Sequence, residues 1–137
     1  MTNQEAFARM VLHLRKQGAK SADGVDTKGT PVCRYRSGNG MRCAVGVLIT
    51  DDVYSADFEG QVATGPEVAT ALKYLGLNLL FARAMQDVHD RMTVAQWETG
   101  FEYVARTWDL TLPAPGHEHE YIPSPCAECE PAKEVVA

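Results

Sequence analysis

Apolar residues recur every three or four positions in four segments of the chain, which is the spacing of one face of an α-helix. The first segment carries signals for both helix ends. Thr2 and Glu5 have the spacing of a capping box, and Gly18 is a typical stop residue. The sequence therefore predicts a first helix that ends at Gly18, with an apolar face made of Phe7, Met10, Val11 and Leu14.

Three more helices are predicted further along the chain. The second covers 65–76, because proline is tolerated in a first turn and the segment closes on a glycine. The third covers 78–90 and is capped by Asn78. The fourth begins at Thr93, which has capping-box spacing to Gln96. Its apolar face consists of Val94, Trp97, Phe101, Val104, Ala105 and Trp108.

A β-hairpin is expected between the first two helices. Residues 19–31 are polar and predict an exposed connector. Residues 32–36 and 41–43 predict two short strands, because the Ser-Gly-Asn-Gly turn between them tolerates positive φ angles. The alternation of a strand places Cys33 and Tyr35 on the inner face. The apolar run CAVGVLI that follows the hairpin, residues 43–49, favours a short helix. Residues 51–59 are acidic and irregular and predict isolated helical turns.

These elements predict one mostly helical α+β domain over residues 1–110, in which the short hairpin packs against three or four helices. A chain of 137 residues with 45% hydrophobic residues can bury one modest core. Residues 111–137 hold most of the prolines and several acids without an apolar period, and they predict an irregular acidic tail.

Charge is distributed unevenly along the chain. The first fifty residues carry eight basic and three acidic side chains, whereas the rest carries five basic and fifteen acidic ones, for a net charge of -5. This asymmetry favours oriented docking onto a protein partner, through the basic hairpin or the acidic tail. The overall negative charge of the chain argues against adhesion to a membrane surface. Binding to nucleic acid is possible but is not favoured by this charge. No apolar run could cross a bilayer and the start lacks a signal-peptide core, so we expect a cytoplasmic protein.

The tail contains four candidate metal ligands, which are His117, His119, Cys126 and Cys129. Imidazole and thiolate groups bind zinc tetrahedrally, and the C-x-x-C spacing suits a zinc knuckle. Two prolines lie between the two ligand pairs. A solvated acidic tail without a cofactor is therefore the favoured interpretation, and a zinc site is the alternative.

The second candidate site consists of Cys33 and Cys43, which flank the hairpin, with His89 and Asp90 much later in the chain. Within it, Cys43, His89 and Asp90 have the chemistry of a thiol hydrolase. Neighbouring residues on a helix project about 100° apart, so Asp90 is not expected to orient the ring of His89. Buried structural thiols and a bonded histidine are the favoured interpretation. His89-Asp90 also matches the central dyad of HD-type metal phosphohydrolases, but the further His and Asp of that site are not convincingly placed.

Arg34, Arg36 and Arg42 form a third candidate site around the hairpin. Guanidinium groups bind carboxylates or phosphates in a fork geometry, and strand alternation places Arg34 and Arg36 toward water. The sequence therefore predicts a binding surface for an acidic protein partner, a nucleotide or a nucleic-acid backbone. A merely solvated strand face is an equal alternative.

The order of motifs over about residues 5–110 resembles a group of small uncharacterised phage and prophage proteins. The resemblance rests on CRYRSGNGMRCAVGVLI, DDVYSADFEG, the helix end MQDVHD and the following Trp97. It implies a phage accessory protein without implying an activity. We therefore expect a non-enzymatic protein that binds a host or phage macromolecule and modulates host defence. A small hydrolase of the thiol or metal-dependent type, and a virion or assembly component, are the alternatives.

Overall fold

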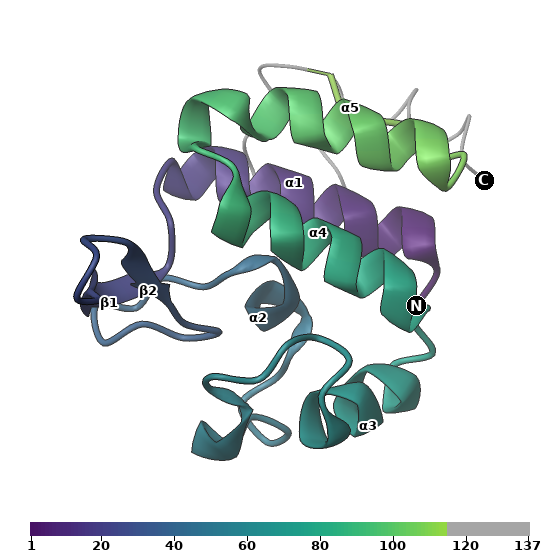
Figure 1. The fold of residues 1–137 in the computed structure, drawn as a ribbon. Helices are drawn as coiled ribbons and strands as arrows, with labels where there is room; N and C mark the ends of the chain where they lie inside the picture. The colour runs from purple at the N-terminus through teal and green to yellow at the C-terminus, as the bar shows by residue number, and fades with distance from the viewer. Residues whose placement is uncertain (115–137) are drawn as a thin grey trace.

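The computed structural model describes residues 1–114 and shows a mostly helical α+β domain (Figure 1). The long helices α1, α4 and α5 lie side by side, and α2 and α3 lie below them together with a two-stranded antiparallel sheet. The helices are α1 (Asn3–Gln17), α2 (Ala44–Leu48), α3 (Pro66–Tyr74), α4 (Leu79–Arg91) and α5 (Trp97–Thr107). The strands are β1 (Ala22–Val25) and β2 (Pro31–Cys33), and short 3-10 turns occur at Ala56–Phe58 and Val94–Gln96.

Local capping signals set the helix ends, as the sequence predicts. Thr2 and Glu5 form both hydrogen bonds of a capping box at the start of α1, and Gly18 closes that helix in the left-handed conformation. The side chain of Asn78 accepts hydrogen bonds from two backbone N–H groups at the start of α4. Thr93 and Gln96 form the second capping box, immediately before α5.

The predicted hairpin is correct only in part: β2 overlaps the first predicted strand, but the second predicted strand, 41–43, does not form. The sheet pairs β2 with β1, which lies inside the segment expected to be an exposed connector. The turn at 37–40 does form, but residues 36 and 42 flank it with a single β-bridge in place of two strands. The strand β1 has almost no buried face, so its sequence shows no alternation of apolar and polar residues.

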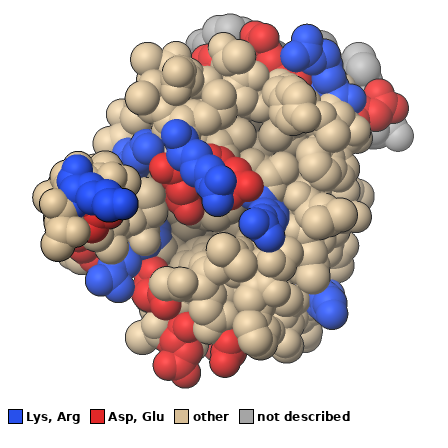
Figure 2. Space-filling view, in the orientation of Figure 1, with Lys and Arg blue, Asp and Glu red and all other residues tan. Residues whose placement is uncertain are grey.

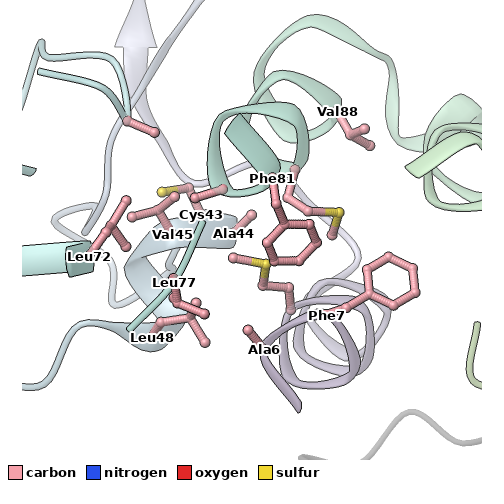
Figure 3. Close-up of a cluster of buried hydrophobic side chains, with 14 of the residues drawn as sticks. Ala6, Phe7, Cys43, Ala44, Val45, Leu48, Leu72, Leu77, Phe81 and Val88 are labelled. Atoms are coloured by element: carbon pink, nitrogen blue, oxygen red, sulfur yellow. The ribbon is translucent and has the colours of Figure 1, made fainter. Parts of the chain in front are cut away.

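The hydrophobic core lies between α1, α2 and α4 (Figure 3). The ring of Phe81, on α4, makes edge contacts with Phe7 of α1 and with Trp108 after α5, at centroid distances of 6.4 and 6.0 Å. Gly100 lets α5 approach α4 closely, because a Cβ there would lie 2.8 Å from a methyl group of Val88. Most of the apolar face predicted for this helix is confirmed, because Trp97, Phe101, Val104 and Ala105 are buried. Val94 is an exception, since it lies in the preceding 3-10 turn and is 41% exposed, and Trp108 is only partly buried.

The carboxylate of Glu59 holds the segment that follows β2. It accepts hydrogen bonds from the backbone N–H groups of Tyr35 and Arg36, at 2.9 and 3.2 Å, and from the hydroxyl of Tyr54, at 2.7 Å. The hydroxyl of Tyr35 donates in turn to the carbonyl oxygen of Gln61. These bonds join the 59–61 loop to the chain after β2, and this junction forms one side of the pocket described below.

The last described residues lie against α1. Gln4 exchanges two hydrogen bonds with the backbone of Thr111, and Arg15 donates to the carbonyl oxygens of Pro113 and Ala114. The same guanidinium makes a two-pronged ion pair with Glu98 of α5.

Candidate functional site

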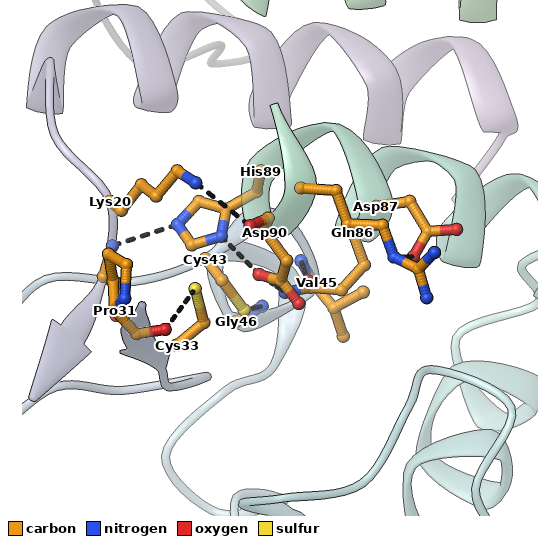
Figure 4. Close-up of polar contacts among 12 residues, drawn as sticks. Lys20, Pro31, Cys33, Cys43, Val45, Gly46, Gln86, Asp87, His89 and Asp90 are labelled. Atoms are coloured by element: carbon orange, nitrogen blue, oxygen red, sulfur yellow. Dashed lines mark hydrogen bonds and ion pairs between the residues drawn. The ribbon is translucent and has the colours of Figure 1, made fainter. Parts of the chain in front are cut away.

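Cys33, His89 and Asp90 come together where β2 meets the end of α4 (Figure 4). One polar atom from each residue lies within 4.8 Å of the others. Asp90 follows His89 directly, whereas Cys33 arrives from the distant hairpin. The chemistry of this cluster depends on which of its atoms already have partners.

Both ring nitrogens of His89 are engaged in hydrogen bonds. The side chain is completely buried and stacks on Trp97 at a centroid distance of 5.6 Å. Its Nε2 accepts a 3.0 Å hydrogen bond from the backbone N–H of Ser21. The ring proton therefore lies on Nδ1, which donates to the carboxylate of Asp90 at 2.6 Å. The expectation that Asp90 does not orient the ring of its neighbour is wrong, because the carboxylate reaches back to Nδ1.

The carboxylate of Asp90 is held mainly by neutral donors. It accepts a hydrogen bond from Gln86 Nε2 at 2.9 Å, and Gln86 Oε1 accepts from the N–H of Val45 in α2. Lys20 donates to the backbone carbonyl of Asp90 at 3.0 Å. The cluster thus joins the loop after α1, the start of α2 and the end of α4. This is the arrangement of a structural junction.

The hydrogen bonds of His89 are incompatible with metal binding at this cluster. A histidine ligand needs a free lone pair on one nitrogen, but here Nε2 accepts a backbone N–H and Nδ1 carries the proton. A metal-bound cysteine is a thiolate, whereas burial and the nearby Asp90 raise the pKa of the Cys33 thiol to about 11. Metal binding would require this junction to break.

The structure brings Cys33, and not Cys43, into the group with His89 and Asp90. Cys43 is fully buried at the start of α2, where its sulfur accepts the N–H of Gly46 at 3.4 Å. Burial raises the pKa of this thiol far above its usual value. Neither thiol in residues 1–114 therefore has the lowered pKa of an activated nucleophile. The sequence pattern assigned the thiol chemistry to Cys43 and not to Cys33, because the contact of Cys33 with His89 and Asp90 joins residues that are distant in the chain.

The three hairpin arginines have different environments. Arg36 is folded inward, with 20% of its side chain exposed, and the expectation that it faces water is wrong. Its guanidinium donates to the carbonyl of Ile49, pairs with Asp51 at 2.8 Å and lies 4.4 Å from the ring centroid of Tyr54. Arg42 lies 3.7 Å from the same aspartate. Only Arg34 lines the pocket beside the cluster.

This pocket opens between the end of β2, the 60–63 loop and α4, and has a volume of about 200 Å³. Figure 2 shows this face hollowed next to a group of basic and acidic side chains. Cys33 and Asp90 belong to its lining, so the structural junction borders an open recess. The other lining residues are Arg34, Tyr35, Gly60, Gln61, Val62, Ala63, Arg83, Gln86 and Asp87.

The four predicted zinc ligands, His117, His119, Cys126 and Cys129, lie outside the described residues. Within residues 1–114, no helix has the length and apolar character needed to cross a membrane. No family model matches the chain, and no curated protein or solved structure shows significant similarity to it.

Proposed function

We propose that this protein is a non-catalytic, phage-encoded accessory protein that binds a host or phage macromolecule in the host cytoplasm and modulates a host defence. The main support for a protein without catalytic activity is that both ring nitrogens of His89 are engaged in hydrogen bonds. A general base needs a free lone pair facing the group it deprotonates. Both nitrogens of His89 are already used to join Ser21 to Asp90.

The pocket supports the binding part of the proposal. It lies beside the hydrogen-bonded cluster of His89, Asp90 and Gln86, which fixes the backbone on one side of the recess. Charged groups of both signs line it. Such a surface suits recognition of a polar partner, and the phage assignment rests separately on the order of sequence motifs.

The proposal is tested by comparing binding with turnover in the full-length protein. Tagged chain is used to capture partners from phage-infected cells, and each candidate is purified and tested for direct binding. His89→Phe keeps a ring on Trp97 but deletes both hydrogen bonds, and should lower the free energy of unfolding by about 1–3 kcal/mol. Cys33→Ser should leave the fold intact. We expect His89→Phe to bind the partner as the wild type does at temperatures below its melting transition.

The opposite outcome is equally measurable. Wild-type protein and both variants are assayed with ester, thioester and phosphodiester substrates. Turnover by the wild type that disappears in well-folded Cys33→Ser or His89→Phe would reject the non-catalytic proposal. It would favour a hydrolase centred on the cluster.

A further inference from the structure

Two arginines in the pocket lining, Arg34 and Arg83, have only long ion pairs and no side-chain hydrogen bond within residues 1–114. The nearest carboxylate to Arg34 is Asp23, at 3.7 Å, and the nearest to Arg83 is Asp87, at 4.0 Å. Both distances exceed that of a hydrogen bond, and neither guanidinium donates one within residues 1–114. The Nε of Arg34 is also buried without a hydrogen-bond partner.

Other arginines of this chain show what satisfied guanidinium groups look like here. Arg15 makes two bonds of 2.9 and 2.7 Å to Glu98 and further bonds to backbone carbonyls. Arg36 has a carbonyl, a carboxylate and an aromatic ring as partners. Arg34 and Arg83 differ because they keep the forked donor pattern that matches an oxyanion.

The two groups reach the pocket from separate elements. Arg34 directly follows β2, and Arg83 lies on α4, so an anion in the recess could be held from two sides. Each side chain is about two-fifths exposed. We infer that this pocket binds the carboxylate of an aspartate or glutamate side chain from a protein partner, with Arg34 and Arg83 as its donors.

Carboxylate is favoured over the phosphates of a nucleic acid for two reasons. Asp87 and Asp90 line the same pocket, and their charge would repel a densely charged backbone much more than a single carboxylate. The chain also carries a net charge of -5, which opposes general binding to nucleic acid. This inference rests on the proposed function, because it names the partner chemistry of the same surface.

The test is an NMR titration of the arginine Nε–H signals in full-length protein. The probes are a capped peptide of alternating Glu and Ser, the same peptide with Gln in place of Glu, and an oligothymidylate of matched charge. We expect the Glu peptide to shift the signals of Arg34 and Arg83, the Gln peptide to leave them unchanged, and added salt to weaken the effect. Arg34→Gln and Arg83→Gln should each weaken binding by about tenfold.

Arg91→Gln is the matched control. Arg91 lies on the same helix as Arg83 and makes a similarly long ion pair with the same carboxylate, at 3.6 Å, but it does not line the pocket. Its replacement should leave binding unchanged. Arg83→Lys, which keeps the charge without the fork, should recover only part of the affinity. Melting curves are recorded for every variant, so that a loss of fold is recognised.

Several outcomes would overturn the inference. These are an equal loss of binding in Arg91→Gln, tighter binding of the oligothymidylate than of the Glu peptide, or unchanged Arg34 and Arg83 signals with every probe. If a captured partner still binds normally to the Arg34→Gln/Arg83→Gln double variant, the accessory function stands and another surface makes the contact. If no partner binds at all while the Glu peptide does, the proposed function fails and the pocket chemistry stands.

Discussion

A methyl group at position 46 would lie 2.1 Å from the carbonyl oxygen of Tyr35. Gly46 is in α2, and its missing side chain lets the chain after β2 pass directly over that helix. Because the obstacle is backbone, it cannot move aside as the end of a flexible side chain could. Glycine is therefore needed at this position of the CAVG motif, because the backbone of Tyr35 comes too close to α2 for any side chain to fit.

Gly46→Ala should lower the free energy of unfolding by about 1–3 kcal/mol or more, because a buried site without free space must be overpacked. Chemical denaturation measures the effect. Gly38→Ala is the matched control: its new Cβ would meet only the side chain of Asp23, at 3.5 Å. A Gly46→Ala protein as stable as the control would show that α2 and the hairpin are not packed as described.

The buried thiols predict how stability depends on pH. Burial raises the pKa of Cys43 above its ordinary value of 9.0, and raises the pKa of Cys33 to about 11. The folded state therefore keeps protons that the unfolded state loses above pH 9. The stabilisation from these neutral thiols is fully present below pH 9 and is lost as the pH rises through the folded values.

Urea unfolding between pH 8 and pH 10.5 tests this expectation. The free energy of unfolding should fall above about pH 9. The fall should be shallower in Cys43→Ala, even though this variant is less stable at neutral pH. An identical slope in wild type and Cys43→Ala would mean that the Cys43 thiol is not protected by the fold.

At the scale of elements, α5 is attached mainly through one apolar face that packs on α4. Phe101→Ala should cost about 3–5 kcal/mol, because it removes a fully buried ring and leaves a cavity. Tyr103→Ala, two positions away on the exposed face, should change stability by less than about 0.5 kcal/mol. Thermal melting of the two variants measures the difference. Equal melting temperatures would contradict the packing of α5.

The helices could be predicted from the sequence because their signals are local. Thr2 with Glu5, and Thr93 with Gln96, act within one turn of the helix that they start. The strand β1 could not be predicted, because its four residues are stabilised by pairing with β2 and not by burial of a face. The local sequence pattern of β1 does not show that β2 will pair with it.

The candidate site was only partly predictable for the same reason. His89 and Asp90 are adjacent in sequence and were named together, but the bond between their side chains was not expected, because neighbouring helical residues point in different directions. The third member, Cys33, is placed by the sheet, and Arg83 faces the pocket only because α4 packs beside the chain after β2. One local signal was available: Gln86 and Asp90 are four residues apart on α4, so a bond between their side chains could have been expected.

At the scale of the whole molecule, most of the net charge belongs to the C-terminal segment. Residues 115–137 contain five glutamates and one lysine, a balance of -4 out of the total of -5. The rest of the chain is therefore nearly neutral. Any long-range electrostatic attraction to a basic partner would come from this acidic segment, while the pocket arginines act at short range.

The zinc hypothesis for this segment has a direct test. If His117, His119, Cys126 and Cys129 form a site, protein purified without chelator should carry about one zinc per chain. Elemental analysis measures it, and Cys126→Ser/Cys129→Ser should abolish it. Replacing Cys33 by serine should not reduce the zinc content. Protein without stoichiometric zinc would leave the solvated acidic tail as the interpretation.

The carboxylate of Glu59 also has a consequence for self-association. An extended segment with unpaired backbone N–H groups is a template to which a strand of another molecule can add. Glu59 occupies two such groups, those of Tyr35 and Arg36, and its negative charge repels the carbonyl oxygens of an approaching strand. These two N–H groups, which follow β2, are thereby closed to a strand of another molecule, so a Glu59→Ala chain should aggregate at concentrations where light scattering shows the wild type to be monodisperse.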